Sequence, residues 1–213
     1  LCGRMVQLMY KVSSVHPPTL GWLEIILEDN EINFLWECIK NKKENAKHKL
    51  VGNVTNSFDL IDNDNWFFKN ILDPLCSSYT NEFKNLGEDI PLVFPHPYCL
   101  KGFWVNYQNQ TEFNPLHRHL GVYSFVVWMK IPTDFKEQEK TTAAKSAKEQ
   151  VISSFKFQFL NIFGDIIGHK YGMSPEKEGM MLFFPSRLNH VVYPYYECKE
   201  DRISISGNIF IDV

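Results

Sequence analysis

Three of the seven histidines occur in a pattern that is typical of a metal site. His117 and His119 are separated by one residue just before a predicted strand, and His190 lies far along the chain at the start of another. In an extended segment residues i and i+2 project to the same side, so both imidazoles can approach one ion. A third histidine from a distant strand completes a facial arrangement that leaves positions open for O₂ and a chelating ligand.

Arg202 strengthens this pattern because it follows His190 by twelve residues and lies on the next predicted strand. Arg202, Ser204 and Ser206 share one face of that strand, whereas isoleucines mostly occupy the other face. Polar groups that point into a core are costly unless they bind a polar ligand. A guanidinium with a neighbouring hydroxyl suits a carboxylate that is held by two hydrogen bonds.

Short β-rich runs fill the chain from Leu100 onward and must position these residues. Seven strands are predicted, over residues 102–108, 123–131, 155–163, 166–171, 179–184, 190–193 and 202–211. Seven strands in about 110 residues predict a barrel or sandwich. Between them, residues 134–150 are polar and rich in lysine and alanine, so we expect a solvated excursion from the barrel.

The first hundred residues are predicted to form a helical and irregular lead-in. Asp29-Asn30-Glu31 can cap a helix whose apolar residues recur at helical spacing up to Ile39, and this helix should lie on one face of the sheet. A second helix is predicted after Asp64, interrupted or offset at Pro74 and ended by Gly87.

Length and composition favour one domain over residues 1–213, with residues 1–100 leading into a β core over residues 101–213. The chain has 213 residues, of which 44% are hydrophobic, enough to bury a sizeable core. A formal net charge of -3 and scattered lysines give no basic surface for nucleic acid. We therefore expect a small-molecule or protein substrate, and the sequence does not indicate an oligomeric state.

The sequence also favours a cytoplasmic protein that does not bind a membrane. The five cysteines are far apart and form no C-x-x-C pair, which indicates reduced thiols. No apolar run is long enough for a membrane span, and Leu1 to Tyr10 lack the apolar run of a signal peptide. Many asparagines, and more lysine than arginine, are typical of an AT-rich genome, so we expect a marine bacterium or a phage-infected host cell.

Taken together, His117-x-His119, the Phe-Pro-Ser turn before His190, and Arg202-x-Ser204 resemble the Fe(II)/2-oxoglutarate oxygenase superfamily, in particular its bacterial and phage prolyl-hydroxylase-like branch. The resemblance covers residues 103–213. It implies a double-stranded β-helix, a cupin-like jelly roll with the N-terminal helices packed on the sheet. It also implies a dioxygenase that uses Fe(II), 2-oxoglutarate and O₂ to hydroxylate a protein side chain or a small metabolite.

The resemblance also implies roles for individual residues. In this family the distal histidine binds iron, and an arginine on the following strand binds the far carboxylate of 2-oxoglutarate. These roles map to His190 and Arg202, and Ser204 resembles the usual hydroxyl partner of the arginine. Tyr123, which begins the strand after the histidine pair, is a further candidate for contacting 2-oxoglutarate.

Two further residues are candidates for contacting the substrate. Asn106 lies on a strand that the implied fold places beside the pocket. Arg118 lies between the two histidines and must point away from the metal by strand parity, so we expect it at the rim of the site.

The first motif departs from the family pattern, which is His-x-Asp or His-x-Glu. With His117 as first ligand, His119 takes the place of the carboxylate and a three-histidine site results, which we favour because both rings project to one side. With His119 as first ligand, Gly121 takes that place, as in the halogenase branch, where chloride fills the vacant position. Three neutral ligands leave the charge of iron uncompensated, so bound 2-oxoglutarate would supply the anion.

Two alternatives without this chemistry remain open at the level of sequence. A cupin shares the fold, and the spacing of Gly179, Pro185 and His190 matches its later motif, but no acidic ligand occurs between Glu112 and Asp134. The other alternative is a binding module that holds a metal or small acid without turnover, or a phage structural jelly roll.

Overall fold

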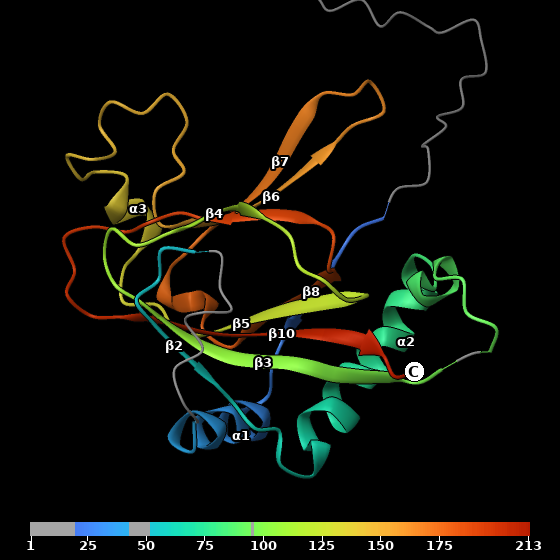
Figure 1. The fold of residues 1–213 in the computed structure, drawn as a ribbon. Coiled ribbons are helices and arrows are strands. Elements are labelled where there is room, and N and C mark those ends of the chain that lie inside the picture. The colour runs from blue at the N-terminus through green and yellow to red at the C-terminus, as the bar shows by residue number, and fades with distance from the viewer. Residues whose placement is uncertain (1–19, 43–51, 95) are drawn as a thin grey trace, which may run out of the picture.

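Two antiparallel sheets face each other in the computed structural model, which describes residues 20–42, 52–94 and 96–213 (Figure 1). The six-stranded sheet has the order β1-β8-β5-β10-β3-β2, and the four-stranded sheet has the order β4-β9-β6-β7. The features predicted at Cys2 and at Leu1 to Tyr10 lie outside the described residues. In the described part of the chain, no helix combines the length and apolar character that a bilayer crossing requires.

All seven predicted strands are present, with ends shifted by a few residues. They are β3 (Tyr98–Gln108), β5 (Tyr123–Lys130), β6 (Ser154–Leu160), β7 (Ile166–Gly172), β8 (Met180–Pro185), β9 (Asn189–Val192) and β10 (Arg202–Ile211). Long runs of alternating or β-branched residues carry enough periodicity to be recognised in the sequence.

Three further strands escaped prediction: β1 (Leu23–Ile26), β2 (Asn56–Asp59) and β4 (Asn114–His117). Each has only four residues and lies at the edge of its sheet. Four residues are too few for a pattern of period two, and β4 also contains Pro115, which is tolerated at a sheet edge because its missing N–H faces away from the ladder.

The first predicted helix is confirmed as α1 (Asp29–Lys40), but its cap is one residue earlier than predicted. Glu28 is the N-cap and forms a capping box with Glu31, so Asp29-Asn30-Glu31 make up the first turn. Acidic residues in a first turn interact favourably with the helix dipole. Asp29 and Glu31 therefore mark the start of the helix in the sequence, although the N-cap itself is the residue before them.

The second predicted helix is divided into several pieces. A 3₁₀ turn (Asn63–Asn65) and a π-helical segment (Phe68–Leu72) precede α2 (Asp73–Glu82), and a 3₁₀ helix (Leu86–Asp89) follows it. Pro74 lies in the first turn of α2, where its missing N–H costs nothing, so the predicted offset at this proline is confirmed. The helix ends at Glu82 rather than at Gly87, which lies in the 3₁₀ helix instead.

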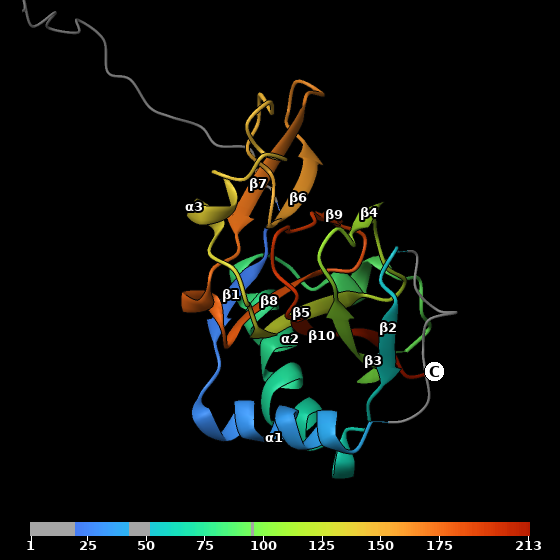
Figure 2. The same ribbon diagram turned by 90° about the vertical axis from the view of Figure 1, so that its left-hand side faces the viewer.

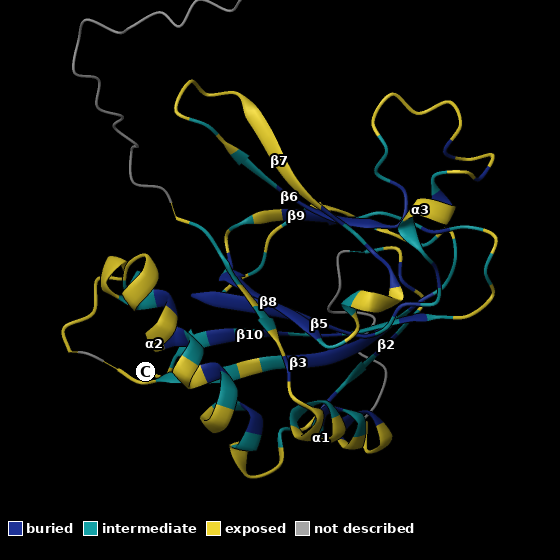
Figure 3. Cartoon of the chain, turned by 180° about the vertical axis from the view of Figure 1, so that it is seen from behind, coloured by how far each residue is buried: buried dark blue, intermediate teal, exposed yellow. Residues whose placement is uncertain are grey.

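The six-stranded sheet separates two hydrophobic cores. One core lies between this sheet and the helices α1 and α2, which cover its outer face as predicted (Figure 2). The other lies between the two sheets and includes Trp128, Phe155, Phe157 and Phe184. The central strands β5 and β8 are therefore buried on both faces, as their dark colour shows (Figure 3), whereas buried and half-buried residues alternate along β10. Alternate residues of one strand face different cores.

The predicted excursion over residues 134–150 is mostly exposed and contains the short helix α3 (Phe135–Gln138). It is attached to the barrel by the buried Gln138 side chain. The amide of this side chain donates to the Tyr196 carbonyl (2.8 Å) and its oxygen accepts from the Tyr196 N–H (2.8 Å). This segment therefore holds a defined position beside the end of β9.

Asp62 stabilises the start of the second helical region, because its two carboxylate oxygens accept the N–H groups of Phe67 and Phe68 (2.8 Å each). We predict that Asp62→Ala lowers the free energy of unfolding by about 1 to 2 kcal/mol, as expected for a lost helix cap. Chemical denaturation measures this change. Glu82→Ala, an exposed change in the last turn of α2, is the control, and an equal loss there would contradict the capping role.

Candidate metal centre

The three histidines singled out in the sequence come together at one point between the sheets. His117 ends β4, His119 follows it, and His190 lies on β9, directly opposite His117 in the strand pairing. One ligand nitrogen from each ring lies within 4.8 Å of the other two. Three imidazole nitrogens at this separation can bind one transition-metal ion on one side and leave the opposite side open.

Backbone groups fix the orientation of all three residues. Nδ1 of His117 donates to the Pro115 carbonyl (2.7 Å) and Nδ1 of His190 donates to the Leu188 carbonyl (2.9 Å), because a carbonyl oxygen can only accept. The Nε2 atoms of both rings are then the unprotonated nitrogens that can bind a metal. The His119 N–H donates to the Ser186 carbonyl (2.8 Å), which ties this residue to the turn before β9.

Burial keeps the three rings neutral. It lowers the pKa of His119 to about 4, with a smaller contribution from His117, and it holds the pKa of His190 well below its usual range. The pKa of His117 is also lowered, mainly by burial. Neutral imidazoles can bind a metal without first losing a proton, so the site is ready to bind at neutral pH.

Among the described residues, no carboxylate joins the three histidines. The alternative with His119 as first ligand and a vacancy at Gly121 does not fit this geometry. A Cβ atom on Gly121 would lie 2.7 Å from the Ile209 carbonyl and 3.2 Å from the Phe210 ring, so this position faces β10. Gly121 has a φ of +107°, which identifies it as a backbone turn that requires glycine.

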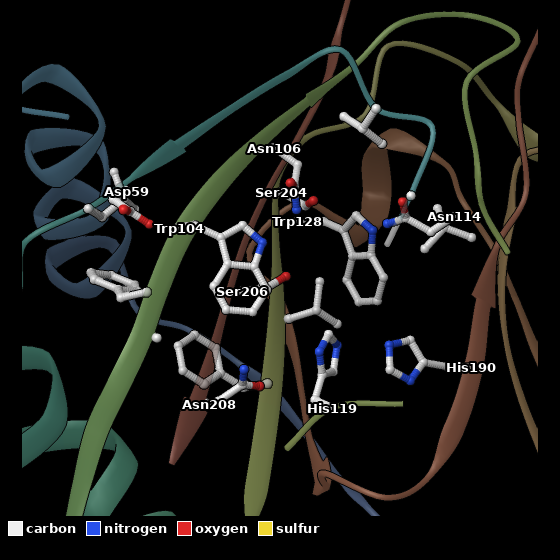
Figure 4. Close-up of a pocket in the computed structure, with 18 of the residues that line it drawn as sticks. Asp59, Trp104, Asn106, Asn114, His119, Trp128, His190, Ser204, Ser206 and Asn208 are labelled. Atoms are coloured by element: carbon white, nitrogen blue, oxygen red, sulfur yellow. The ribbon is translucent and has the colours of Figure 1, made fainter. Parts of the chain in front are cut away.

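The histidines line one wall of a cavity of about 570 Å³ between the sheets (Figure 4). Alternate residues of β10 line the same cavity: Arg202, Ser204, Ser206 and Asn208. The predicted parity of this strand is therefore confirmed. Phe155 stacks on the His190 ring at 5.4 Å between ring centroids, so apolar side chains surround the metal position.

Arg202 lies in this cavity as a buried cation. Its Nη2 donates to the Ser153 hydroxyl (2.8 Å), its guanidinium lies 4.9 Å from the centroid of the Tyr195 ring, and its Nε has no hydrogen-bond partner among the described residues. It forms no ion pair with a described acidic residue. Burial lowers its pKa to about 10, so the group stays charged at neutral pH.

The structure contradicts the prediction for Tyr123. This side chain is fully buried in the core between the helices and the outer face of the sheet, with its ring 5.1 Å from that of Tyr79. The odd-numbered residues of β5 belong to that core, whereas Val126 and Trp128 face the space between the sheets; of the odd-numbered residues, Phe125 also reaches the cavity and Tyr123 does not. Tyr123 is therefore not a contact of 2-oxoglutarate, because strand parity directs its side chain away from the cavity.

The two substrate candidates differ in their positions. Asn106 lines the cavity, and its amide oxygen lies 2.8 Å from the Ser57 hydroxyl. Arg118 is exposed and does not line the cavity, in agreement with its predicted orientation away from the metal. Sequence reasoning missed Gln108, Ser153 and Trp104. Gln108 and Trp104 have the parity of Asn106 on β3 and could have been found from it, but Ser153 reaches Arg202 only through the tertiary fold.

Comparison with known proteins identifies the class to which this site belongs. Residues 102–208 match the family described as "Putative 2OG-Fe(II) oxygenase", in which 2OG is 2-oxoglutarate. This match covers half of the chain, and the chain belongs to that family. It is therefore an oxygenase with His117, His119 and His190 as its iron-binding triad, and Fe(II) and 2-oxoglutarate are its implied cofactors. This assignment favours an oxygenase over the cupin and binding-module alternatives.

Two solved structures of prolyl hydroxylases align with this chain at low sequence identity. A prolyl-4-hydroxylase from Pseudomonas putida aligns with a TM-score of 0.50 and 15% identity, over 92% of this chain and 95% of that chain. The viral collagen prolyl hydroxylase of Paramecium Bursaria Chlorella virus-1 aligns with a TM-score of 0.49 and 14% identity, over 88% and 94% of the two chains. No curated protein sequence matches the chain. The first of these likenesses confirms the predicted double-stranded β-helix.

We predict that His190→Ala weakens Fe(II) binding by more than about 100-fold, because even the loss of an outer partner of a metal ligand costs about 10- to 100-fold. Anaerobic titration with Fe(II) measures this loss. His169→Ala is the matched control, since that ring lies on β7 against Trp22 and outside the triad. Equal affinities of the His190→Ala variant and the wild type would contradict the assignment.

Proposed function

We propose that this oxygenase hydroxylates a C–H bond of a protein side chain or small metabolite, and that Arg202 and Ser204 hold 2-oxoglutarate beside the triad. The observation that carries the proposal is the buried cation Arg202, which lies without a described acidic partner in the same cavity as the three histidines. A buried charge is stable only when it is paired, so the cavity calls for an anionic ligand at this end.

The surroundings of Arg202 favour a carboxylate as that anion. Ser153 and Gln108 hold the two terminal nitrogens in place, at 2.8 and 3.4 Å, and leave Nε for a further acceptor. Ser204 lies on the same face of β10, so its hydroxyl can donate to the same ligand. A planar carboxylate matches the planar guanidinium better than a single-point acceptor does.

The neutral triad supports binding of 2-oxoglutarate from the metal side. Three imidazoles leave the charge of Fe(II) uncompensated, so an anionic ligand gains more here than at a site that already contains a carboxylate. Arg202 and the metal would then attract the two opposite ends of one dianion. Metal binding and 2-oxoglutarate binding are expected to strengthen each other for this reason.

The cofactors supply the oxidising chemistry when bound: 2-oxoglutarate is decarboxylated to succinate as O₂ is consumed, and one oxygen atom goes to the substrate. The chain positions these partners and excludes water. Phe155 and Phe184 pack against the His190 ring at 5.4 and 5.2 Å between centroids, which keeps the metal position dry on that side.

The rest of the cavity is large enough for a single side chain or small molecule together with 2-oxoglutarate. Asn106, Trp104 and Asn208 form a polar wall there (Figure 4). The Trp104 indole N–H is buried and has no partner among the described residues, so it can donate to an acceptor on the substrate. This wall supports a substrate with polar groups near the oxidised carbon.

We predict that Arg202→Met weakens 2-oxoglutarate binding by about 10- to 100-fold, the value of a hydrogen bond to a charged group. The readout is the weak visible charge-transfer band that arises when 2-oxoglutarate chelates protein-bound Fe(II) under anaerobic conditions. Arg187→Met, which removes an exposed arginine, and Tyr123→Phe, on the far face of β5, should leave the titration unchanged. An equal loss of 2-oxoglutarate affinity in Arg187→Met would contradict the assignment of Arg202 as the residue that binds this ligand.

We also predict that 2-oxoglutarate tightens metal binding by about tenfold or more in the wild type, and that His119→Asp reduces this coupling. The aspartate would supply the negative charge that the wild-type ligand set lacks. Titrations with the redox-stable ion Co(II), with and without 2-oxoglutarate, measure the coupling in both proteins. A coupling that is unchanged in His119→Asp would show that ligand charge is not its cause.

A further inference from the structure

Ser153 has a backbone conformation that serine rarely adopts inside a protein core. Its φ is +50°, in the left-handed region, and its side chain is fully buried. Glycine adopts this conformation without strain, whereas a residue with a Cβ atom does not. The other described non-glycine residues with positive φ are all exposed: Asp64, Asn65, Thr111 and Glu197. A strained residue persists in a core only where its surroundings hold it, and such residues cluster at functional sites.

Every polar group of Ser153 has a partner. Its N–H donates to the Pro194 carbonyl (2.7 Å), and its carbonyl accepts from the Met173 N–H (2.9 Å). Its hydroxyl oxygen accepts from Nη2 of Arg202 (2.8 Å) and lies 3.2 Å from the hydroxyl of Thr133. Because a guanidinium only donates, the hydroxyl hydrogen of Ser153 remains available for Thr133. A glycine could make both backbone contacts, so the hydroxyl is the group that requires serine here.

The hydroxyl pair of Thr133 and Ser153 also joins the two ends of the excursion over residues 134–150, which contains α3 (Figure 1). Thr133 directly precedes this segment, and Ser153 follows its end by three residues. Both side chains are buried, at 8% and 0% exposure. The mostly exposed excursion is therefore closed at its base by the same hydroxyl that binds Arg202.

A second attachment of the excursion also lies next to Arg202. Gln138 holds both the N–H and the carbonyl of Tyr196 (2.8 Å each). The neighbouring Tyr195 places its ring centroid 4.9 Å from the guanidinium, and its hydroxyl accepts from the backbone N–H of Arg202 (3.3 Å). The excursion is thus attached to both of the segments that contact Arg202, although none of its residues lines the cavity.

We propose that Ser153 is a positioning residue for 2-oxoglutarate: its hydroxyl fixes the direction of the Arg202 guanidinium, and the excursion holds Ser153 in the strained conformation that this contact requires. The inference rests on the proposed function, in which Arg202 binds 2-oxoglutarate. With Nη2 on Ser153, the Nε atom that lacks a described partner is kept available for the ligand. Fixing a long side chain before binding reduces the entropy that is lost when the ligand binds.

The test compares Ser153→Ala with Ser153→Gly, because both variants lack the hydroxyl but only the first keeps the backbone strain. We expect each variant to bind 2-oxoglutarate about tenfold more weakly than the wild type, as for one lost hydrogen bond. The folding equilibrium constant of Ser153→Gly should nevertheless be about threefold larger than that of Ser153→Ala. The anaerobic charge-transfer titration with Fe(II) measures the affinity, and chemical denaturation measures the stability.

Asp64→Gly is the control for backbone strain, since Asp64 has a φ of +57°, is exposed and does not line the cavity. It should leave the affinity for 2-oxoglutarate unchanged. In the excursion, Gln138→Ala should weaken 2-oxoglutarate binding about threefold or more, because Tyr196 loses its anchor. Lys140→Ala, which removes an exposed ion pair with Glu137 (2.6 Å), should have no effect. Fe(II) affinity without 2-oxoglutarate should be unchanged in all of these variants.

An affinity that falls in Ser153→Ala and recovers in Ser153→Gly together with the stability would show a purely structural role and overturn the proposal. Wild-type affinity in both Ser153 variants, or in Gln138→Ala, also overturns it. Arg202→Met tests the proposed function separately. If that variant also binds 2-oxoglutarate normally, the proposed function itself fails, whereas a loss in Arg202→Met alone removes only the role of Ser153.

Discussion

The pairing of β4 with β9 is the constraint on which the site depends. It places His117 directly opposite His190, and the Ser186 carbonyl then fixes the backbone of His119. A slip of one residue would direct one of these rings to the other face of the sheet and abolish the cluster. The register is held in turn by β6, which pairs with β9 on its other side and whose Phe155 and Phe157 pack against the His190 ring.

Charge is distributed unusually between the two ends of the cavity. The metal end offers three neutral ligands and the other end holds a buried guanidinium, and no described carboxylate joins the triad or forms an ion pair with Arg202, although Asp59 and Asp62 line the cavity elsewhere. Both ends are therefore suited to the same kind of ligand, a small dianion that spans them. One bound dianion would compensate the buried charge of Arg202 and the charge of the metal at the same time. The ligand, and not a protein carboxylate, would then link metal binding to the stability of the buried guanidinium.

The parts of the fold that could be predicted are those in which sequence periodicity and burial agree. Strands such as β5 and β10 are long and rich in β-branched or aromatic residues, so their positions and the parity of Arg202, Ser204 and Ser206 followed from the pattern. The orientation of β5 could not be predicted in this way. Both of its faces are apolar because a core lies on each side, and the pattern therefore gave no reason to exclude Tyr123 from the cavity.

The sequence by itself determined the ligand types, the same-side projection of His117 and His119, and the polar face of β10, because these depend only on residue identity and strand geometry. Only the tertiary structure decided that all three histidines converge, that Gly121 is a turn facing β10, and that Ser153 supports Arg202. Those outcomes depend on the register between strands far apart in the chain. That register is set by packing and backbone hydrogen bonds between segments whose separation in sequence carries no local signal.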